Sequence, residues 1–119
     1  MKIAFSTSGK DLNAPLDTRF GRAPGFLVFD TESREFTIVD NTQNLNAMQG
    51  AGVQSAQNVA AAGAEVLVSG HCGPKAFAVL SAAGVKVYTS QADTVGDALK
   101  LFEEGSLKES TSADVGGHW

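Results

Sequence analysis

Short apolar runs alternate with longer polar or glycine-rich stretches along this chain of 119 residues. Runs with the length and composition of buried or half-buried strands lie at 2–6, 26–30, 35–40, 65–69 and 85–88. A short polar link joins the second and third runs and predicts a hairpin. Helices are predicted at 50–63, 74–83 and 95–102, with Gly63 and Gly105 as the expected ends of the first and last.

The order of these elements, βββαβαβα, predicts an α/β domain with a mixed five-stranded sheet and flanking helices. Its second strand runs antiparallel, and right-handed crossovers through the helices make the other strands parallel. The carboxyl ends of the parallel strands then share one edge with the glycine-rich segments 7–25, 41–52 and 70–73. Ligands of open α/β sheets bind at this edge, so we expect the functional site there. The domain should span 1–107, and the polar tail 108–119 should be disordered.

The net charge and the cysteine content exclude several function classes. At a net charge of −4, the chain lacks the basic balance on which nucleic-acid binding through phosphates depends. Its one cysteine cannot form an internal disulfide or supply a four-thiolate metal site. No apolar run approaches the roughly 20 residues that cross a bilayer, and no basic-then-apolar leader opens the sequence. We therefore expect a cytoplasmic protein without membrane or nucleic-acid partners.

The sharpest chemical signal is the turn Gly70-His71-Cys72-Gly73, which precedes a helix that begins at Pro74. Glycines let backbone amides approach a ligand, and the first turn of a helix favours anions. His71 and Cys72 are candidate metal ligands, or a base beside a thiolate nucleophile. A small buried residue at a tight turn is an equal interpretation of Cys72. Lys75 either faces the same anion or points to solvent.

Two further segments carry candidate binding residues at the same edge. Arg22, beside Gly21, has a planar guanidinium that suits an anion held at short range. The glycine-rich start of the helix at 50–63 offers backbone amides, and Met48 offers an apolar wall. The full set of candidate cofactor-binding residues is Ser8, Gly9, Lys10, Phe20, Gly21, Arg22, Met48, Gly50, Gly52, Gly70, His71, Cys72, Gly73 and Lys75. The sequence contains no Walker A, G-x-G-x-x-G or G-x-S-x-G motif, so we expect binding rather than catalysis.

Several of these segments form a recognisable series. A first strand leads into Ser6-Thr7-Ser8-Gly9, the motif Phe20-Gly21-Arg22-Ala23 precedes another strand, Gly50-Ala51-Gly52 opens a helix, and residues 69–76 read Ser-Gly-His-Cys-Gly-Pro-Lys-Ala. In this order and spacing, over residues 1–107, the chain resembles the dinitrogenase iron–molybdenum cofactor-binding family of small carrier and accessory proteins. The resemblance implies a ribonuclease-H-like three-layer fold and a non-catalytic binder of anionic metal–sulfide clusters.

The resemblance also implies a cargo and partners. The cargo is a non-covalently held molybdenum–copper–sulfide cluster, with an iron–molybdenum–sulfur cluster as the alternative. Arg22 and His71 match positions of cofactor contact in relatives, and Cys72 is a second candidate for direct ligation. The implied partners are a cluster donor or acceptor protein or an assembly ATPase. A metal-free module that binds small anions or nucleotides is a rival interpretation, whereas nuclease chemistry is disfavoured because the strand at 2–6 contains no acid.

Overall fold

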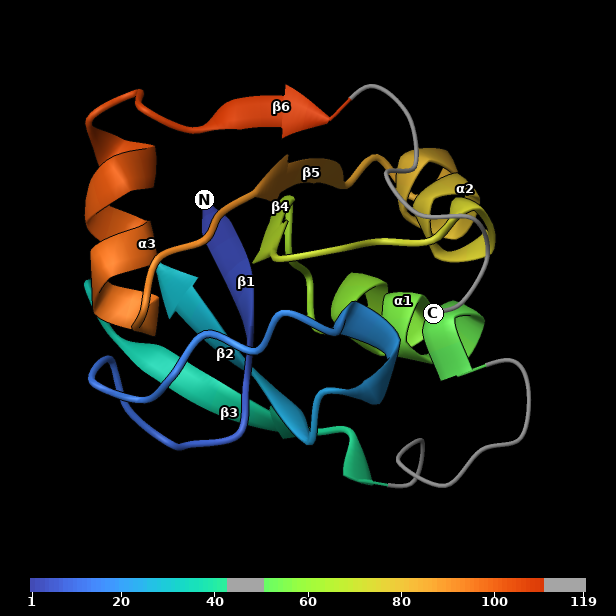
Figure 1. Ribbon diagram of the computed structural model, residues 1–119, viewed down its shortest axis with the longest axis horizontal. Coiled ribbons are helices and arrows are strands. Elements are labelled where there is room, and N and C mark those ends of the chain that lie inside the picture. The colour runs from blue at the N-terminus through green and yellow to red at the C-terminus, as the bar shows by residue number, and fades with distance from the viewer. Residues whose placement is uncertain (43–50, 111–119) are drawn as a thin grey trace.

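A mixed β-sheet with helices on both faces organises the computed structural model, which describes residues 1–42 and 51–110 (Figure 1). Helices α1 and α2 cover one face, and α3 covers the other (Figure 1). This three-layer arrangement agrees with the predicted α/β class. The elements are β1 (Lys2–Thr7), η1 (Phe20–Arg22), β2 (Gly25–Asp30), β3 (Phe36–Asp40), α1 (Ala51–Ala61), β4 (Val66–Ser69), α2 (Pro74–Ala82), β5 (Lys86–Thr89), α3 (Val95–Glu103) and β6 (Lys108–Ser110).

The strand order across the sheet is β3-β2-β1-β4-β5-β6. Strands β1, β4 and β5 run parallel, whereas β2 is antiparallel to both β1 and β3. The prediction of an antiparallel second strand in a mixed sheet is therefore confirmed. The carboxyl ends of β1, β3, β4 and β5 share one edge, as expected.

The predicted number of five strands is wrong, because the described residues form a six-stranded sheet. The additional strand, β6, lies antiparallel to β5 and pairs Ser110 with Val87 and Lys108 with Thr89. The segment Lys108–Ser110 thus belongs to the sheet rather than to a disordered tail. This segment has no alternation of apolar and polar residues. Backbone pairing with the edge of the sheet holds it in place, and a pattern of hydrophobic positions cannot reveal such pairing. The ribonuclease-H-like label stays a prediction.

Local sequence explains where the helices begin and end. Pro74 occupies the first turn of α2, where its missing N–H leaves no acceptor unpaired. Helix α3 begins after Thr94, whose hydroxyl accepts a hydrogen bond from the Asp97 N–H at 3.1 Å. Both Gly63 and Gly105 adopt positive φ just beyond their helices, as predicted for C-terminal caps. No helix in 1–42 or 51–110 is long and apolar enough to cross a membrane.

Two hydrophobic cores lie on opposite faces of the sheet. Side chains of α1 and α2 pack on one face, where they enclose Phe20 and Cys72. Side chains of α3 pack on the other, together with Leu12 and Leu16 of the loop between β1 and β2. This loop therefore starts on the α3 face and ends on the α1/α2 face. It crosses the carboxyl edge of the sheet between Leu16 and Phe20.

An ion pair ties the opposite edge of the sheet to α3. The Arg34 guanidinium donates to both carboxylate oxygens of Glu103, at 2.6 and 3.2 Å, and lies 4.9 Å from the centre of the Phe29 ring. The hydrogen bond from Arg34 lowers the pKa of Glu103, and the same bond raises the pKa of Arg34. Both side chains are exposed enough for water to screen the pair, so it adds only modest stability.

Candidate functional site

The crossing of the β1–β2 loop meets the turn between β4 and α2. Arg19 forms a parallel β-bridge with His71, so the two backbones run side by side at this point. Below them, the buried Ser6 hydroxyl lies 2.7 Å from the Asp17 carbonyl oxygen and 2.8 Å from Ser69 Oγ. These contacts fix the loop to the ends of β1 and β4.

Gly70 serves this crossing rather than an open anion cradle. A Cβ at Gly70 would lie 2.6 Å from Thr18 Cα and 2.8 Å from the Thr18 carbonyl oxygen, closer than real Cβ atoms approach. Only glycine therefore lets the crossing loop pass so near the turn. Gly70 is buried, whereas the neighbouring His71 is exposed at the surface.

A buried hydrogen-bond network holds η1 against α1. The Asn41 side-chain amide donates to the Ala23 carbonyl at 2.8 Å and to Ser55 Oγ at 3.0 Å. The Ser55 hydroxyl in turn donates to the Gly21 carbonyl at 3.3 Å, and the Asn58 amide donates to Asn41 Oδ1 at 2.8 Å. The side chains of Asn41 and Ser55 are fully buried. The network, defined here as Asn41, Ser55 and Asn58, holds the backbone on both sides of Arg22 in place.

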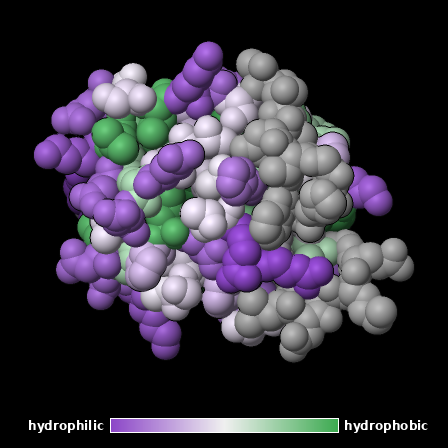
Figure 2. All heavy atoms as spheres, viewed as in Figure 1, coloured by the Kyte–Doolittle hydropathy of each residue, from purple (hydrophilic) through white to green (hydrophobic). Residues whose placement is uncertain are grey.

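Arg22 ends η1 and is partly exposed, while the preceding Phe20 anchors the turn in the core. The Phe20 ring packs against Phe26 with centroids 5.4 Å apart. Figure 2 shows strongly hydrophilic side chains gathered over η1 and the chain that leads into it. A guanidinium on a well-anchored turn, at the edge where ligands of such sheets bind, suits recognition of an anion.

Two helices begin on this same side of the sheet. Helix α2 follows Gly73, which has no side chain to cap the first turn, so the helix presents its own N–H groups there. Lys75 is exposed in that turn. Gly52 is buried within the first turn of α1 and thus contributes to packing. The predicted residues Met48 and Gly50 lie outside the described residues.

Cys72 lies inside the core and not at the surface. It is 2% exposed and packs among the side chains that α1, α2 and η1 bring together. Its Sγ lies 3.8 Å from the Gly73 carbonyl oxygen. This placement favours the small-buried-residue interpretation over a ligand or nucleophile. In 1–42 and 51–110, no group of three or more His, Cys, Asp or Glu side chains could hold a metal ion.

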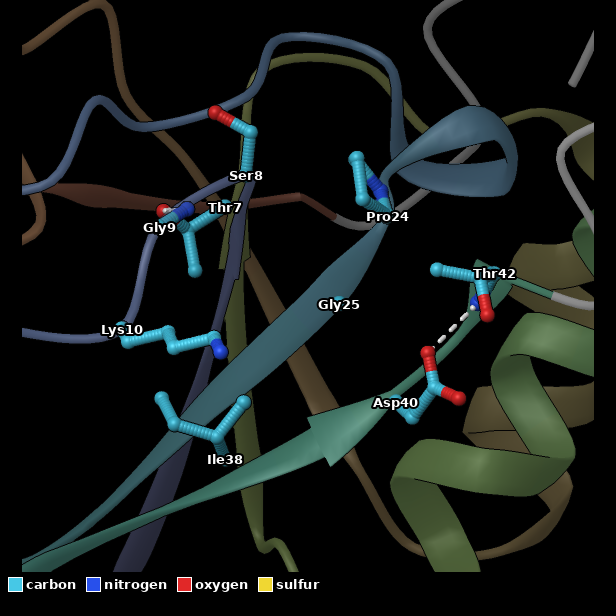
Figure 3. A pocket seen from close by; sticks show the side chains of 9 residues that line it. All are labelled: Thr7, Ser8, Gly9, Lys10, Pro24, Gly25, Ile38, Asp40 and Thr42. Carbon is cyan, nitrogen blue, oxygen red and sulfur yellow. Dashed lines mark hydrogen bonds between the residues drawn. The ribbon is translucent and has the colours of Figure 1, made fainter.

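The remaining predicted residues, Ser8, Gly9 and Lys10, line a separate open groove of about 570 Å³ (Figure 3). Its other walls come from the ends of β1, β2 and β3. In an antiparallel pair, opposite residues share a face, and Ile38 pairs with Leu27 of the α3-side core. The groove therefore opens on the α3 face. The complete lining is Thr7, Ser8, Gly9, Lys10, Pro24, Gly25, Ile38, Asp40 and Thr42.

Within the groove, the Asp40 carboxylate is already engaged. Its Oδ1 accepts a hydrogen bond from the Thr42 N–H at 3.0 Å (Figure 3), and this bond lowers the pKa of Asp40. Lys10 extends along the groove beside Ile38 (Figure 3). The sequence predicted that these candidate residues converge on one site, but the structure separates them. Arg22 and His71 lie at the α1/α2 side of the edge, which we call the η1 side. Lys10 lies at the groove side.

Sequence reasoning missed the residues that fix η1. Ser55 carried a usable signal, since it lies four residues before the core residue Val59, and a serine on the apolar stripe of a helix usually has a polar partner. Asn41 gave a weaker signal, because asparagine after a strand commonly ends it through local hydrogen bonds. Its contact with Ser55 depends on how α1 packs against η1.

Comparison with protein families, with single sequences and with solved structures finds proteins similar to this chain. The family model described as "Dinitrogenase iron-molybdenum cofactor" matches residues 1–105. An uncharacterised protein of Methanocaldococcus jannaschii is 33% identical over 112 residues, which cover 92% of this chain and 91% of the relative. The apo form of the orange protein from Desulfovibrio gigas is 38% identical, with a TM-score of 0.93 and 96% of each chain covered.

A solution structure from Thermotoga, of a protein provisionally named NifB, is also similar. It is 37% identical with a TM-score of 0.82, and the match covers 96% of this chain and 98% of that one. At these identities and coverages, this chain shares both its fold and the order of its segments with the relatives.

Proposed function

We propose, on the premise that this chain belongs to the dinitrogenase iron–molybdenum cofactor family, that it binds and carries an anionic molybdenum-containing metal–sulfide cluster without covalent attachment. The cluster binds at the η1 side of the carboxyl edge. The protein acts there as a carrier and not as an enzyme.

The observation that carries this proposal is the buried network under η1. Buried amide and hydroxyl groups are costly unless they are hydrogen-bonded, and here Asn41 and Ser55 are used to hold the turn that ends in Arg22. The backbone of a turn held in this way is already ordered when a ligand binds, so only the Arg22 side chain loses conformational freedom.

The chemistry of a metal–sulfide cluster fits this side of the edge. Such a cluster brings its own sulfides and a negative charge, so it requires cations and N–H donors more than protein thiolates. Arg22, His71, Lys75 and the first turn of α2 supply these groups locally, in a chain whose net charge is −4. The burial of Cys72 agrees with a site that holds its cluster through cations and N–H donors rather than through a protein thiolate.

The composition of the cargo and the partners are the finer parts of the proposal. We favour a molybdenum–copper–sulfide cluster, the cargo that the sequence resemblance implies. An iron–molybdenum–sulfur cluster is the alternative, supported by the family description. A carrier of this kind exchanges its cluster with a donor or acceptor protein or with an assembly ATPase.

The test is an anaerobic titration of the apo-protein with tetrathiomolybdate and a copper salt, followed by visible absorption and by metal analysis after desalting. Wild type should retain colour with the two metals in fixed ratio. The variant Arg22→Ala should bind roughly tenfold more weakly, the loss expected for about 1.4 kcal/mol from one charge-assisted contact. Arg34→Ala is the matched control, because it removes the same charge at the opposite edge, and Cys72→Ser should retain more cluster than Arg22→Ala.

Complete loss of colour from wild type on desalting would contradict the molybdenum–copper cargo, and iron–molybdenum–sulfur clusters would be titrated next. Equal retention in Arg22→Ala and wild type would contradict the electrostatic role of the η1 side. Arg22→Lys separates the two contributions of arginine, since it keeps the charge and loses the planar fork.

A further inference from the structure

The outer side of β3 presents unpaired main-chain groups. Strand β3 is the last strand of the sheet on its side. The Asp30 N–H donates to the Glu35 carbonyl at 2.9 Å, and the Asn41 N–H donates to the Pro24 carbonyl at 2.8 Å. Hydrogen-bonded pairs alternate along an antiparallel ladder, so these two bonds fix which residues face β2. The N–H and C=O groups of Phe36 and Ile38 point away from the sheet, and no strand of the described residues pairs with them.

This edge is also apolar up to its last residue, Asp40. Phe36 is 38% exposed and Ile38 is 39% exposed, and both side chains lie on the α3 face because they are two residues apart. Proteins usually protect an edge strand with lysine, proline or a bulge, and residues 36–39 read Phe-Thr-Ile-Val. The opposite edge differs, since β6 has three residues and exposes Lys108 and Glu109.

The shape of the β3 edge is complementary to itself. An antiparallel pairing of two β3 strands about a two-fold axis at Ile38 places the Phe36 of one copy opposite Asp40 of the other. Asp40 and Ile38 line the groove of about 570 Å³, whose walls include Pro24 and the extended side chain of Lys10 (Figure 3). Each copy thus offers an exposed aromatic ring at one end of β3 and a groove at the other, with an ammonium group near the position of the ring.

We propose that β3 pairs antiparallel with β3 of a second copy of this chain, continuing the sheet across the two molecules. The outward N–H and C=O groups specify a strand as the occupant, and the ring-and-groove relation specifies a second copy. One short strand from each copy makes a small interface. The dimer therefore forms reversibly, with a Kd of about 10–100 µM. The pairing does not depend on the proposed cluster.

Sedimentation velocity of the apo-protein from about 5 to 500 µM tests the proposal, and the range brackets the expected Kd. Wild type should shift from monomer to dimer with concentration. Ile38→Pro removes an N–H that β2 does not use, so it should fold and remain monomeric. Ile38→Lys, which keeps that N–H, should also be monomeric and serves if the proline variant does not fold. Ser81→Lys adds the same charge on the exposed face of α2 and should dimerise like wild type.

A wild type that stays monomeric over the whole range overturns the proposal. So does a dimer that persists in folded Ile38→Pro and Ile38→Lys, because association then uses another surface. Amide hydrogen exchange adds a direct readout: the Ile38 N–H should gain protection with concentration, whereas the Thr37 N–H, which faces β2, should be protected throughout.

Discussion

The two sides of the carboxyl edge are built in different ways. On the η1 side, Asn41 and Ser55 are fully buried and their hydrogen bonds hold the chain on both sides of Arg22. On the groove side, Ser8 and Lys10 are exposed, and Lys10 extends along an open surface (Figure 3). Both sides carry a cation and glycines, so composition alone does not separate them.

The two sides thus differ in how firmly the chain around each cation is anchored, and not in residue type. A cation on a fixed turn loses only its side-chain freedom on binding, because the backbone around it is already ordered. We accordingly assign anion binding to the η1 side, and contact with a second copy to the groove. Three variants test this assignment, and we take them in order of decreasing expected effect on the protein.

Gly70→Ala should be the most damaging change, because it breaks the crossing that brings the η1 side together. The new Cβ would meet the Thr18 backbone at 2.6 Å, and backbone cannot rotate away as a side chain can. We expect a loss of about 3 kcal/mol in the free energy of unfolding, measured by urea denaturation. Gly84→Ala is the control: its Cβ meets nothing within 4 Å, and only its positive φ of 79° adds strain, about 1 kcal/mol. Equal losses in the two variants would contradict the close-packing argument.

Ser55→Ala tests the network itself. It removes the hydroxyl that donates to the Gly21 carbonyl and accepts from Asn41, so each of these buried groups loses one hydrogen bond. The free energy of unfolding should fall by about 2 kcal/mol, and cluster retention should fall with it because η1 loosens. Ser81→Ala, on the exposed surface of α2, should change neither quantity. Full retention in a destabilised Ser55→Ala would show that η1 needs no anchoring.

Lys10→Ala should have the smallest effect. Lys10 is exposed on the groove side, where water and salt screen its charge. We expect less than a twofold change in cluster affinity in the thiomolybdate titration, against the tenfold change for Arg22→Ala. A loss as large as that of Arg22→Ala would mean that both sides of the edge bind one ligand, so the two sides would not differ in function.

Much of the fold follows from local patterns in the sequence. The alternation of apolar runs with helical segments gave the order of β1 to α3 and the antiparallel β2, and the glycines at Gly63 and Gly105 marked two helix ends. These features are predictable because each depends mainly on residues that are close together in the sequence. The motifs of the η1 turn and of the β4–α2 turn were likewise visible, and the comparisons place the chain in the family they suggested.

The arrangement of the candidate site residues was only half predictable. Arg22 and His71 lie at the expected edge, but sequence reasoning put Lys10 with them and did not identify Asn41 or Ser55. The separation arises because the loop packs Leu12 and Leu16 against α3 and then Phe20 against α1 and α2. These partners are far away in the sequence, so no local pattern shows which face each part of the loop covers.

The α/β class, the parallel strands and the edge that carries the candidate binding motifs follow from the sequence, since periodicity and turn chemistry are local. The burial of Cys72, the addition of Lys108–Ser110 to the sheet and the two sides of the edge become visible in the folded molecule alone. Each of these depends on long-range packing or backbone pairing, in which the stabilising partner is chosen by the whole fold.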